Sequence, residues 1–572
     1  MKMRNIIMAG ICSLAMVSCN YLDFDETNKA QNKEDMFAVF TNVKQMLTNV
    51  YSYMPEYDGF RTAATIDNLA MRDAASDDVE FGTTSATVQN VNNGNWSAVN
   101  TYDDAWTLYG GVRAANEFIV EVENVDISDT FINTNYKQQL EQLGYYPYEA
   151  RVLRAYYFFE LARRYGDIAM PTKVLSIDEA NTIGKTPFSE VIDFIVSECD
   201  ECAAKLPADY KSVPTQEVGR TTKGFALALK TKALLYAASP LHNPGNDKEL
   251  WKAAARAAKE VMDLGIYSLD PATCFNKTES SELILARMNG RSSLYERYNF
   301  PVRLTYGTRT ATFVAAGNYP SQNLVDAFET KNGYKVTLTA DGWVCDDPQF
   351  DPQKPYDNRD PRFARTILAD GMSLRGETLA VYAGGDDDVS VSLGGSATGY
   401  FVRKFLNEDA NFDPEASGAV PESNHHWVLY RYAETLLSYA EAMVNAFESG
   451  TYVDTEFKVS ALEALNEVRR NASMPAVSGG TKEQLLESIR NEWRVEFALE
   501  DHRFWDVRRW KLGADTQTQL YGVYIVRNLD GTKTYRQRLV ENRTWREAMY
   551  FYPIPQAELF KNTNLYPQNP GW

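Results

Sequence analysis

The chain has 572 residues, of which 77 are acidic and 58 basic, so its formal net charge is −19 with histidine neutral. Hydrophobic residues make up 44% and charged residues 24% of the sequence, a composition that excludes a wholly disordered chain. The acidic balance excludes sequence-independent nucleic-acid binding, because that activity needs an excess of Lys and Arg to neutralise phosphates.

The first segment is typical of an export signal. Lys2 and Arg4 precede an apolar run over 6–17, which is shorter than the ~20 residues that a membrane-spanning helix needs. The run ends in Met16-Val17-Ser18-Cys19, which resembles a bacterial lipoprotein signal cleaved before a lipid-bearing cysteine. An ordinary secretory signal is the alternative. We predict three parts: a signal peptide over 1–18, a lipidated tether over 19–34, and a single folded domain over 35–572.

Amphipathic segments follow the tether up to residue 265. Apolar residues recur every three or four positions in stripes that begin at Phe37, Trp106, Ala150, Phe188 and Phe225. Each predicted helix is followed closely by another, which favours antiparallel helix pairs. The segment 224–264 has the proportions of a tetratricopeptide unit, although a clean 34-residue consensus is missing. The pattern therefore predicts an irregular, tetratricopeptide-like helical array.

One predicted helix contains a C-x-x-C pair, Cys199 and Cys202, a spacing found in redox and zinc sites. Both cysteines fall on the apolar stripe that begins at Phe188, and the sequence has no second C-x-x-C. We therefore predict that they are buried structural residues.

The pattern changes over residues 266–424, which are rich in Gly, Asp, Asn, Pro and aromatic residues. Short strands are predicted over 283–285 and 401–405. A long irregular segment inside a compact protein is usually a binding loop or a flexible one, and the abundant aromatic residues favour binding. A helical stripe resumes over 429–443. We expect one helical scaffold built from 35–265 and 425–572, with the excursion 266–424 lying over it.

Five motifs, in chain order, resemble those of the SusD family, also called RagB/SusD. They are RVLRAYYFFELARRYGD over 151–167, DNRDPRF over 357–363, RYAETLLSYAEA over 431–442, RNEWRVEFALEDHRFWD over 490–506, and PIPQ over 553–556 with the closing NL…QNPG over 564–571. The resemblance covers essentially the whole chain. It implies an all-α fold: an irregular tetratricopeptide-like scaffold with a loop-rich ligand-binding face and a few short strands.

The resemblance also implies a function. Proteins of this family are outer-membrane lipoproteins at the cell surface, here attached through Cys19. They bind nutrients, usually oligosaccharides, and pass them to a TonB-dependent, SusC-like barrel transporter. Capture of peptides by the same type of complex is one alternative, and a purely structural helical scaffold is another. No cofactor is implied, although the Asp-rich stretches 341–360 and 386–388 could hold a structural calcium ion.

The charged residues of these motifs favour a structural role. Carboxylates and guanidinium groups recur among aromatic residues on predicted helices, and buried charges need partners that would lock neighbouring helices together. A carboxylate-based functional site is the less favoured alternative. The residues concerned are Arg431, Glu434, Ser438, Glu441, Asn445, Arg494, Glu496, Arg503 and Asp506.

A sugar binds by lying on an exposed aromatic ring while polar side chains contact its hydroxyl groups. Because aromatic residues on helical stripes are mostly core, candidates must come from loops. Trp96 follows Asn92-Asn93-Gly94-Asn95, and its alternative role is to anchor that loop. The other predicted ligand-binding residues come from two polar or aromatic segments and one further loop: Asp67, Asn68, Arg72, Asp73, Tyr295, Tyr298, Tyr319 and Trp343.

Catalytic motifs are weak. His425 and His426 are adjacent, so they cannot share a helix face as the zinc ligands of H-E-x-x-H do. Gly184-Lys185-Thr186 resembles the end of a P-loop, but Glu179 stands where that motif needs glycine. A glycosidase needs only two carboxylates, so a hydrolase remains a minor alternative. We predict a binding protein and no enzymatic activity.

Overall fold

The computed structural model describes residues 37, 39–55, 70–103, 105–127, 134–209, 217–301, 303–304, 317–391, 394–410, 412 and 422–572. Cys19, Asp67 and Asn68 lie outside the described residues, as do the predicted signal peptide and tether. The predictions for them therefore stay predictions.

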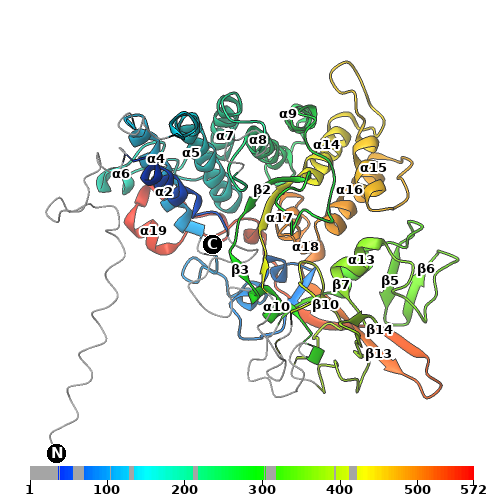
Figure 1. The fold of residues 1–572 in the computed structure, drawn as a ribbon. Helices are drawn as coiled ribbons and strands as arrows, with labels where there is room; N and C mark the ends of the chain where they lie inside the picture. Colours follow the sequence, from blue (N-terminus) through cyan, green and yellow to red (C-terminus); the bar gives the residue numbers. More distant parts are fainter. Residues whose placement is uncertain are drawn as a thin grey trace, which may run out of the picture.

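Most of the longer helices form an arc across the upper half of Figure 1, and α17 lies below it near the centre of the molecule. Neighbours in the arc are mostly neighbours in the chain, because α4 packs on α5, α7 on α8, and α8 on α9. The helix α9 then packs against α14, which lies beyond the excursion, and α14 contacts α15 and α16. The bounds are α2 Phe40–Tyr51, α4 Leu108–Val122, α5 Tyr136–Tyr165, α7 Phe188–Ala203, α8 Lys223–Ala238, α9 Lys248–Asp263, α14 Tyr432–Phe447, α15 Ala461–Asn471, α16 Lys482–Glu496 and α17 Arg503–Arg509.

Side-chain caps fix where several of these helices begin. The hydroxyl of Thr222 accepts a hydrogen bond from the amide of Phe225 at the start of α8. Capping boxes begin α15, at Ser460, and α16, at Thr481. At α7 the preceding residue is Pro187, and the amide of Phe188 donates instead to Asp167 across a loop.

The remaining helices are short and lie at the edges of the arc or in the strand-rich half. They are α3 Val88–Asn92, α6 Ile177–Ala180, α10 Leu294–Asn299, α12 Gln322–Ala327, α13 Pro361–Thr366, α18 Gly513–Thr516 and α19 Gln556–Lys561. Short 3-10 turns occur at Arg72–Ala75, Ala105–Thr107, Glu547–Tyr550 and Thr563–Leu565.

Within the described ranges, the strands pair into seven two-stranded antiparallel sheets, mostly in the lower half of Figure 1. The pairs are β1 Val79–Phe81 with β4 Asn318–Pro320, β2 Leu283–Arg287 with β12 Trp427–Arg431, β3 Arg291–Ser292 with β11 Ser423–Asn424, β5 Val336–Thr339 with β6 Gly342–Cys345, β7 Ile367–Leu368 with β10 Phe401–Val402, β8 Ser373–Leu374 with β9 Glu377–Thr378, and β13 Gln519–Arg527 with β14 Lys533–Asn542.

The predicted all-α, tetratricopeptide-like scaffold with a few short strands is confirmed, but two local predictions need correction and one element was not predicted. The stripe over 429–443 is helical only from Tyr432, because its first residues pair with β2 as strand β12. The strand predicted over 401–405 stops at Val402. The hairpin of β13 and β14 was not predicted.

The cysteine prediction is confirmed. Cys199 and Cys202 are fully buried on α7 and both are free thiols. Burial raises the pKa of Cys202 to about 12, so its thiol stays protonated and unreactive near neutral pH.

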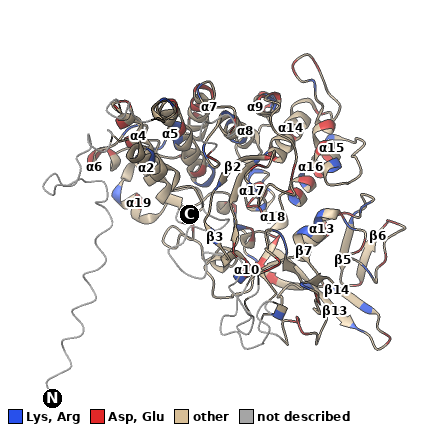
Figure 2. Ribbon diagram, viewed as in Figure 1, with Lys and Arg blue, Asp and Glu red and all other residues tan. Residues whose placement is uncertain are grey.

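Charged residues of both signs are mixed along the helical arc, as Figure 2 shows. No helix in the described part of the chain has the length and hydropathy needed to cross a membrane.

Candidate functional site

A cavity of about 850 Å³ opens where the helical arc meets the strand-rich half. Its walls come from the loop 271–276, the helix α13, the segment 403–408 after β10, the segment 423–425 at β11, and the C-terminal ends of α15 and α16. Cavities of this size are in the range of sites for small organic ligands. We call it the pocket.

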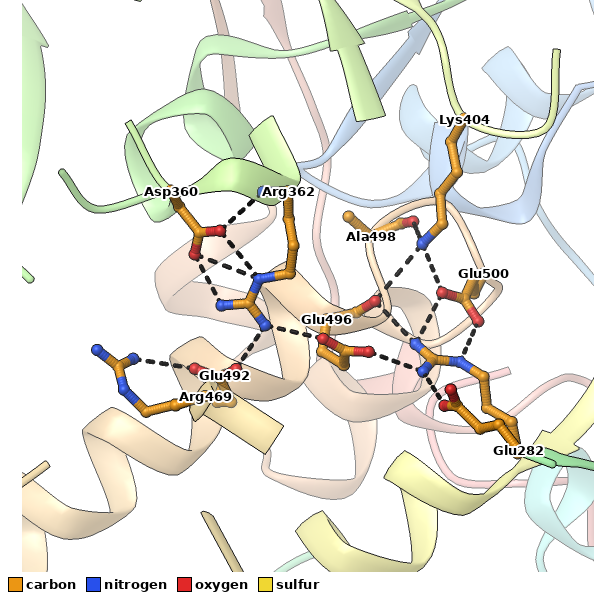
Figure 3. A network of polar contacts seen from close by, with 10 residues as sticks. Glu282, Asp360, Arg362, Lys404, Arg469, Glu492, Glu496, Ala498 and Glu500 are labelled. Carbon is orange, nitrogen blue, oxygen red and sulfur yellow. Dashed lines mark hydrogen bonds and ion pairs between the residues drawn. The ribbon is translucent and has the colours of Figure 1, made fainter. Parts of the chain in front are cut away.

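The bottom of the pocket is an interlocked set of charges (Figure 3). Arg431, at the end of β12, donates to Glu282 at 2.7 Å, to Glu496 at 2.7 Å and to Glu500 at 2.8 Å. These side chains are buried. The guanidinium therefore joins β2, β12 and the end of α16 through one residue.

A second arginine extends this network to the other side. Arg362, on α13, donates to Asp360 at 2.7 Å, to Glu492 at 2.5 Å and to Glu496 at 2.8 Å. Glu492 also accepts from Arg469 at 3.0 Å. Glu496 thus bridges the two arginines, and Figure 3 shows it between them.

Lys404 completes the set from above. Its ammonium group donates to Glu500 at 2.5 Å and to the carbonyl of Ala498 at 2.9 Å. We call Arg362, Lys404, Arg431, Glu496 and Glu500 the charged floor.

The electrostatics of the charged floor are those of satisfied ion pairs. Burial alone would raise the pKa of Glu496, but the guanidinium groups of Arg431 and Arg362 outweigh burial and lower that pKa to about 2. Glu496 is therefore ionised at neutral pH and fully partnered. This geometry agrees with the structural role predicted for Arg431 and Glu496.

Aromatic rings form one side of the pocket mouth. Phe405 lies with its ring centroid 4.7 Å from Phe275, 5.9 Å from Tyr295 and 6.0 Å from Trp427. All four rings are half-buried, and those of Phe275 and Phe405 line the pocket. We call these four residues the aromatic cluster.

The backbone at Phe405 is unusual. Its φ is 68°, in the left-handed region that a residue with a bulky side chain rarely adopts. Such conformations concentrate at ligand-binding sites, where the surrounding structure enforces them. Here the conformation places the ring of Phe405 among the three other rings of the aromatic cluster.

Polar side chains complete the mouth. Arg403 donates to Glu408 at 2.6 Å, and Nε2 of His425 lies 2.6 Å from Oε1 of Glu296. Arg365, on α13, is exposed and forms no hydrogen bond or ion pair with the residues that the structure describes. Four amide side chains also line the pocket: Asn276, Asn407, Asn424 and Asn471.

The sequence model of the SusD family matches residues 282–572, and a model described as "Starch-binding associating with outer membrane" matches residues 20–235. The chain belongs to the SusD family. The charged floor lies entirely within the first match, so its residues belong to the part of the chain that carries the family signature.

Named SusD relatives cover most of the chain. SusD-like proteins P2 and P25 of Formosa agariphila are 23% identical over 440 residues (74% of this chain, 73% of the relative) and 20% identical over 552 residues (91% and 92%).

A crystal structure of a SusD-like protein from Bacteroides fragilis has 28% identity and a TM-score of 0.73, covering 95% of this chain and 99% of that one. Two further SusD-like structures are described by the class of ligand that they bind. One, also from Bacteroides fragilis, is titled a SusD-like carbohydrate binding protein, with 24% identity, a TM-score of 0.71 and coverage of 93% and 100%. The other is titled a laminarin binding SusD-like protein, with 21% identity, a TM-score of 0.57 and coverage of 93% and 99%.

Two predicted aromatic ligand residues of this SusD-family protein are buried. Trp96 is 3% exposed, with edge contacts to Tyr552 at 4.7 Å and Trp572 at 5.1 Å between ring centroids. Tyr319, in β4, is 5% exposed and packs on Phe401. Neither ring offers a free face to a sugar, so Trp96 has the geometry of a loop anchor.

Arg72 and Asp73 are also buried, in a short 3-10 turn. Arg72 donates to Asp501 at 2.5 Å and lies over the ring of Trp505. Burial, together with the nearby charges of Asp78 and Asp501, raises the pKa of Asp73 well above its usual range. These two side chains face the protein interior and not a ligand.

Tyr295 does not itself line the pocket, but it contacts two residues that do: its hydroxyl donates to the carbonyl of Lys404 at 3.2 Å, and its ring packs on Phe405. Tyr298 follows on the same short helix, α10, and is half-buried. Trp343 is elsewhere, in the β5–β6 hairpin, where it packs against Tyr356 and Tyr535.

Phe275, Phe405 and Trp427 were not predicted from the sequence. The sequence predicts a strand at Phe405. The left-handed backbone conformation that directs its ring toward the pocket has no signature in the sequence. Within the described ranges, no group of three or more His, Cys, Asp or Glu side chains is arranged to hold a metal ion.

Proposed function

We propose that this SusD-family protein is a cell-surface lipoprotein that captures oligosaccharides and delivers them, chemically unchanged, to a TonB-dependent SusC-like transporter. The observation that carries this proposal is the pairing of a half-exposed aromatic cluster with amide side chains around one cavity. An aromatic face accepts the C–H surface of a sugar ring, and amides both donate to and accept from hydroxyl groups.

Three lines support the proposal. The pocket volume of about 850 Å³ accommodates more than a single small metabolite. Two structural neighbours are titled as carbohydrate-binding and laminarin-binding. The family model matching residues 20–235 is described as starch-binding and associated with the outer membrane. A binding role without catalysis also fits the charged floor, because its carboxylates are committed to arginine and lysine partners.

The test of ligand class is isothermal titration of the chain that follows the predicted signal against oligosaccharides and oligopeptides. We expect binding to an oligosaccharide, and we expect Phe275→Ala and Phe405→Ala to weaken it about tenfold or more, the value of a lost aromatic platform. Thermal unfolding of each variant verifies that it folds.

Trp343→Ala is the matched control, because it removes a half-buried aromatic side chain away from the pocket. Undiminished affinity in both phenylalanine variants, with loss in Trp343→Ala, would move the site to the β5–β6 hairpin. Binding of peptides alone would replace oligosaccharide capture by the peptide alternative.

The anchor and the transporter have their own test. Replacing Cys19 by serine removes the sulfur that would carry the lipid, so the variant should leave the membrane fraction. The wild-type protein should co-purify with a barrel transporter from detergent-solubilised outer membranes. Unchanged membrane retention of Cys19→Ser would contradict lipidation.

A further inference from the structure

The cations that line the pocket outnumber its carboxylates. The cations are Arg362, Arg365, Arg403, Lys404 and Arg431, against three glutamates. Asp360, Glu492 and Glu282 also pair with the buried arginines, so the charges of the floor are balanced. The excess lies at the mouth, where Arg365 and Arg403 line the pocket against the single carboxylate of Glu408. An excess of cations at a pocket mouth favours a negatively charged ligand, although the whole protein carries −19.

The three carboxylates have little capacity left for a ligand. Glu496 accepts from Arg362 and Arg431, and Glu500 accepts from Arg431 and Lys404. The third, Glu408, accepts from Arg403 at 2.6 Å. A ligand entering the pocket thus meets carboxylates whose negative charge is already balanced.

Two guanidinium groups at the pocket mouth still have hydrogen-bond donors available for a ligand. Arg365 is exposed on α13 and forms no hydrogen bond or ion pair with any residue that the structure describes. Beside it, Arg403 is only partly engaged: its Nε donates to Glu408 and its Nη1 to the carbonyl of Ala364. A guanidinium presents its donors in a planar fork that matches the two oxygens of a carboxylate or the oxygens of a sulfate ester.

We propose that the pocket selects acidic glycans, in which a uronate carboxylate or a sulfate ester pairs with Arg365 while the sugar ring lies against Phe275 and Phe405. This inference rests on the proposed function, since it names the class of oligosaccharide. Carboxylate and sulfate ester share the recognised feature, a pair of anionic oxygens that one guanidinium can bind through two parallel hydrogen bonds, and the experiment distinguishes them.

The acidic surface does not oppose such binding at short range. At physiological ionic strength the Debye length is about 8 Å, so exposed charges on distant helices are largely screened at the pocket. The guanidinium of Arg365 is an exposed charge within the pocket lining, so it is available to an entering anion.

The experiment titrates the chain that follows the predicted signal with three sets of oligosaccharides: neutral, uronate-bearing and sulfated. The strongest uronate ligand is also converted to its methyl ester, which keeps the ring and removes the charge. We expect acidic oligosaccharides to bind, the methyl ester to bind about tenfold more weakly, and affinity to fall as salt is raised.

Variants assign the effect to the residue. Arg365→Gln should weaken binding of the acidic oligosaccharide about tenfold, the value of a charge-assisted hydrogen bond. Arg536→Gln is the control, because Arg536 is an exposed arginine on the β14 strand, outside the pocket. It should bind as the wild type does.

Each alternative result overturns the inference in a distinguishable way. Binding of neutral oligosaccharides alone, or equal affinity for the methyl ester, leaves the proposed function standing and refutes acidic selectivity. Acidic binding that Arg365→Gln leaves unchanged refutes the assigned contact. Absence of binding to all three sets contradicts glycan capture itself.

Discussion

The charged floor and the mouth of the pocket line one cavity but differ in every physical respect. The floor is buried, and each of its charges has two or more partners. At the mouth the aromatic rings are half-buried, and the exposed guanidinium of Arg365 has no partner among the described residues. The difference teaches that the charged motifs, which identify the family, hold the fold together, while the residues available to a ligand lie in segments without a motif.

The largest effect on stability is expected when the charged floor is disrupted. Arg431→Met should lower the free energy of unfolding by about 3–5 kcal/mol, because Glu282, Glu496 and Glu500 would be left as buried charges without this partner. Denaturant unfolding measures the change. Arg536→Met, at an exposed site, should stay within about 0.5 kcal/mol of the wild type. A loss below about 1 kcal/mol in Arg431→Met would show that the network does not support the fold.

Substitution of Trp96, which is not part of the charged floor, also distinguishes a role in stability from a role in ligand binding. Trp96→Ala removes a buried ring from contact with Tyr552 and Trp572, so we expect a loss of about 3–5 kcal/mol in unfolding free energy. Ligand affinity of the folded variant should be unchanged by isothermal titration. Wild-type stability combined with lost binding would restore Trp96 as the ligand platform that the loop composition first suggested.

Acid should weaken the floor through the protonation of Glu496. Glu496 has its pKa lowered from 4.5 to about 2, so the stability it contributes is present above about pH 4.5 and is lost as pH falls toward 2. The expected loss is about 3 kcal/mol. Between these pH values the unfolding free energy of Glu496→Gln should fall less steeply than that of the wild type, and equal slopes would contradict the ion-pair account.

The smallest effect on stability is expected at the mouth of the pocket. Arg365→Gln should change the free energy of unfolding by less than about 0.5 kcal/mol, because its exposed guanidinium has no partner among the described residues. The same denaturant experiment applies. A loss of several kcal/mol would place Arg365 with the floor and remove it from the ligand-binding residues.

Periodicity was enough to predict most of the helical arc, because stripes such as that of α7 continue over several turns. It was not enough at residues 429–431, where a short apolar run fits either a strand or a helix. The β13–β14 hairpin carried an available signal, since Asp530-Gly531 lies in its turn and such pairs favour tight hairpins.

The pocket was harder to predict than the fold. The role of Trp96 depends on Tyr552 and Trp572, which lie more than 450 residues further along the chain, and loop composition does not reveal that packing. The position of Phe405 depends on a backbone conformation that its residue type disfavours. Tyr295 comes from a segment dense in aromatic residues, which indicates a binding loop even when single positions cannot be ranked, and its role in binding a ligand stays a prediction.

The pairing of the two ends of the chain has a consequence for how it folds. Asp77 accepts from Arg494 at 2.9 Å and from Arg503 at 2.8 Å. Strand β1 pairs with strand β4, in which Tyr319 lies opposite Glu80. Contacts between residues so distant in sequence carry a large loop-closure cost and slow the search for the native state. The early helices can pair locally as the chain lengthens, but the segment around Asp77 closes only when the last 80 residues are available.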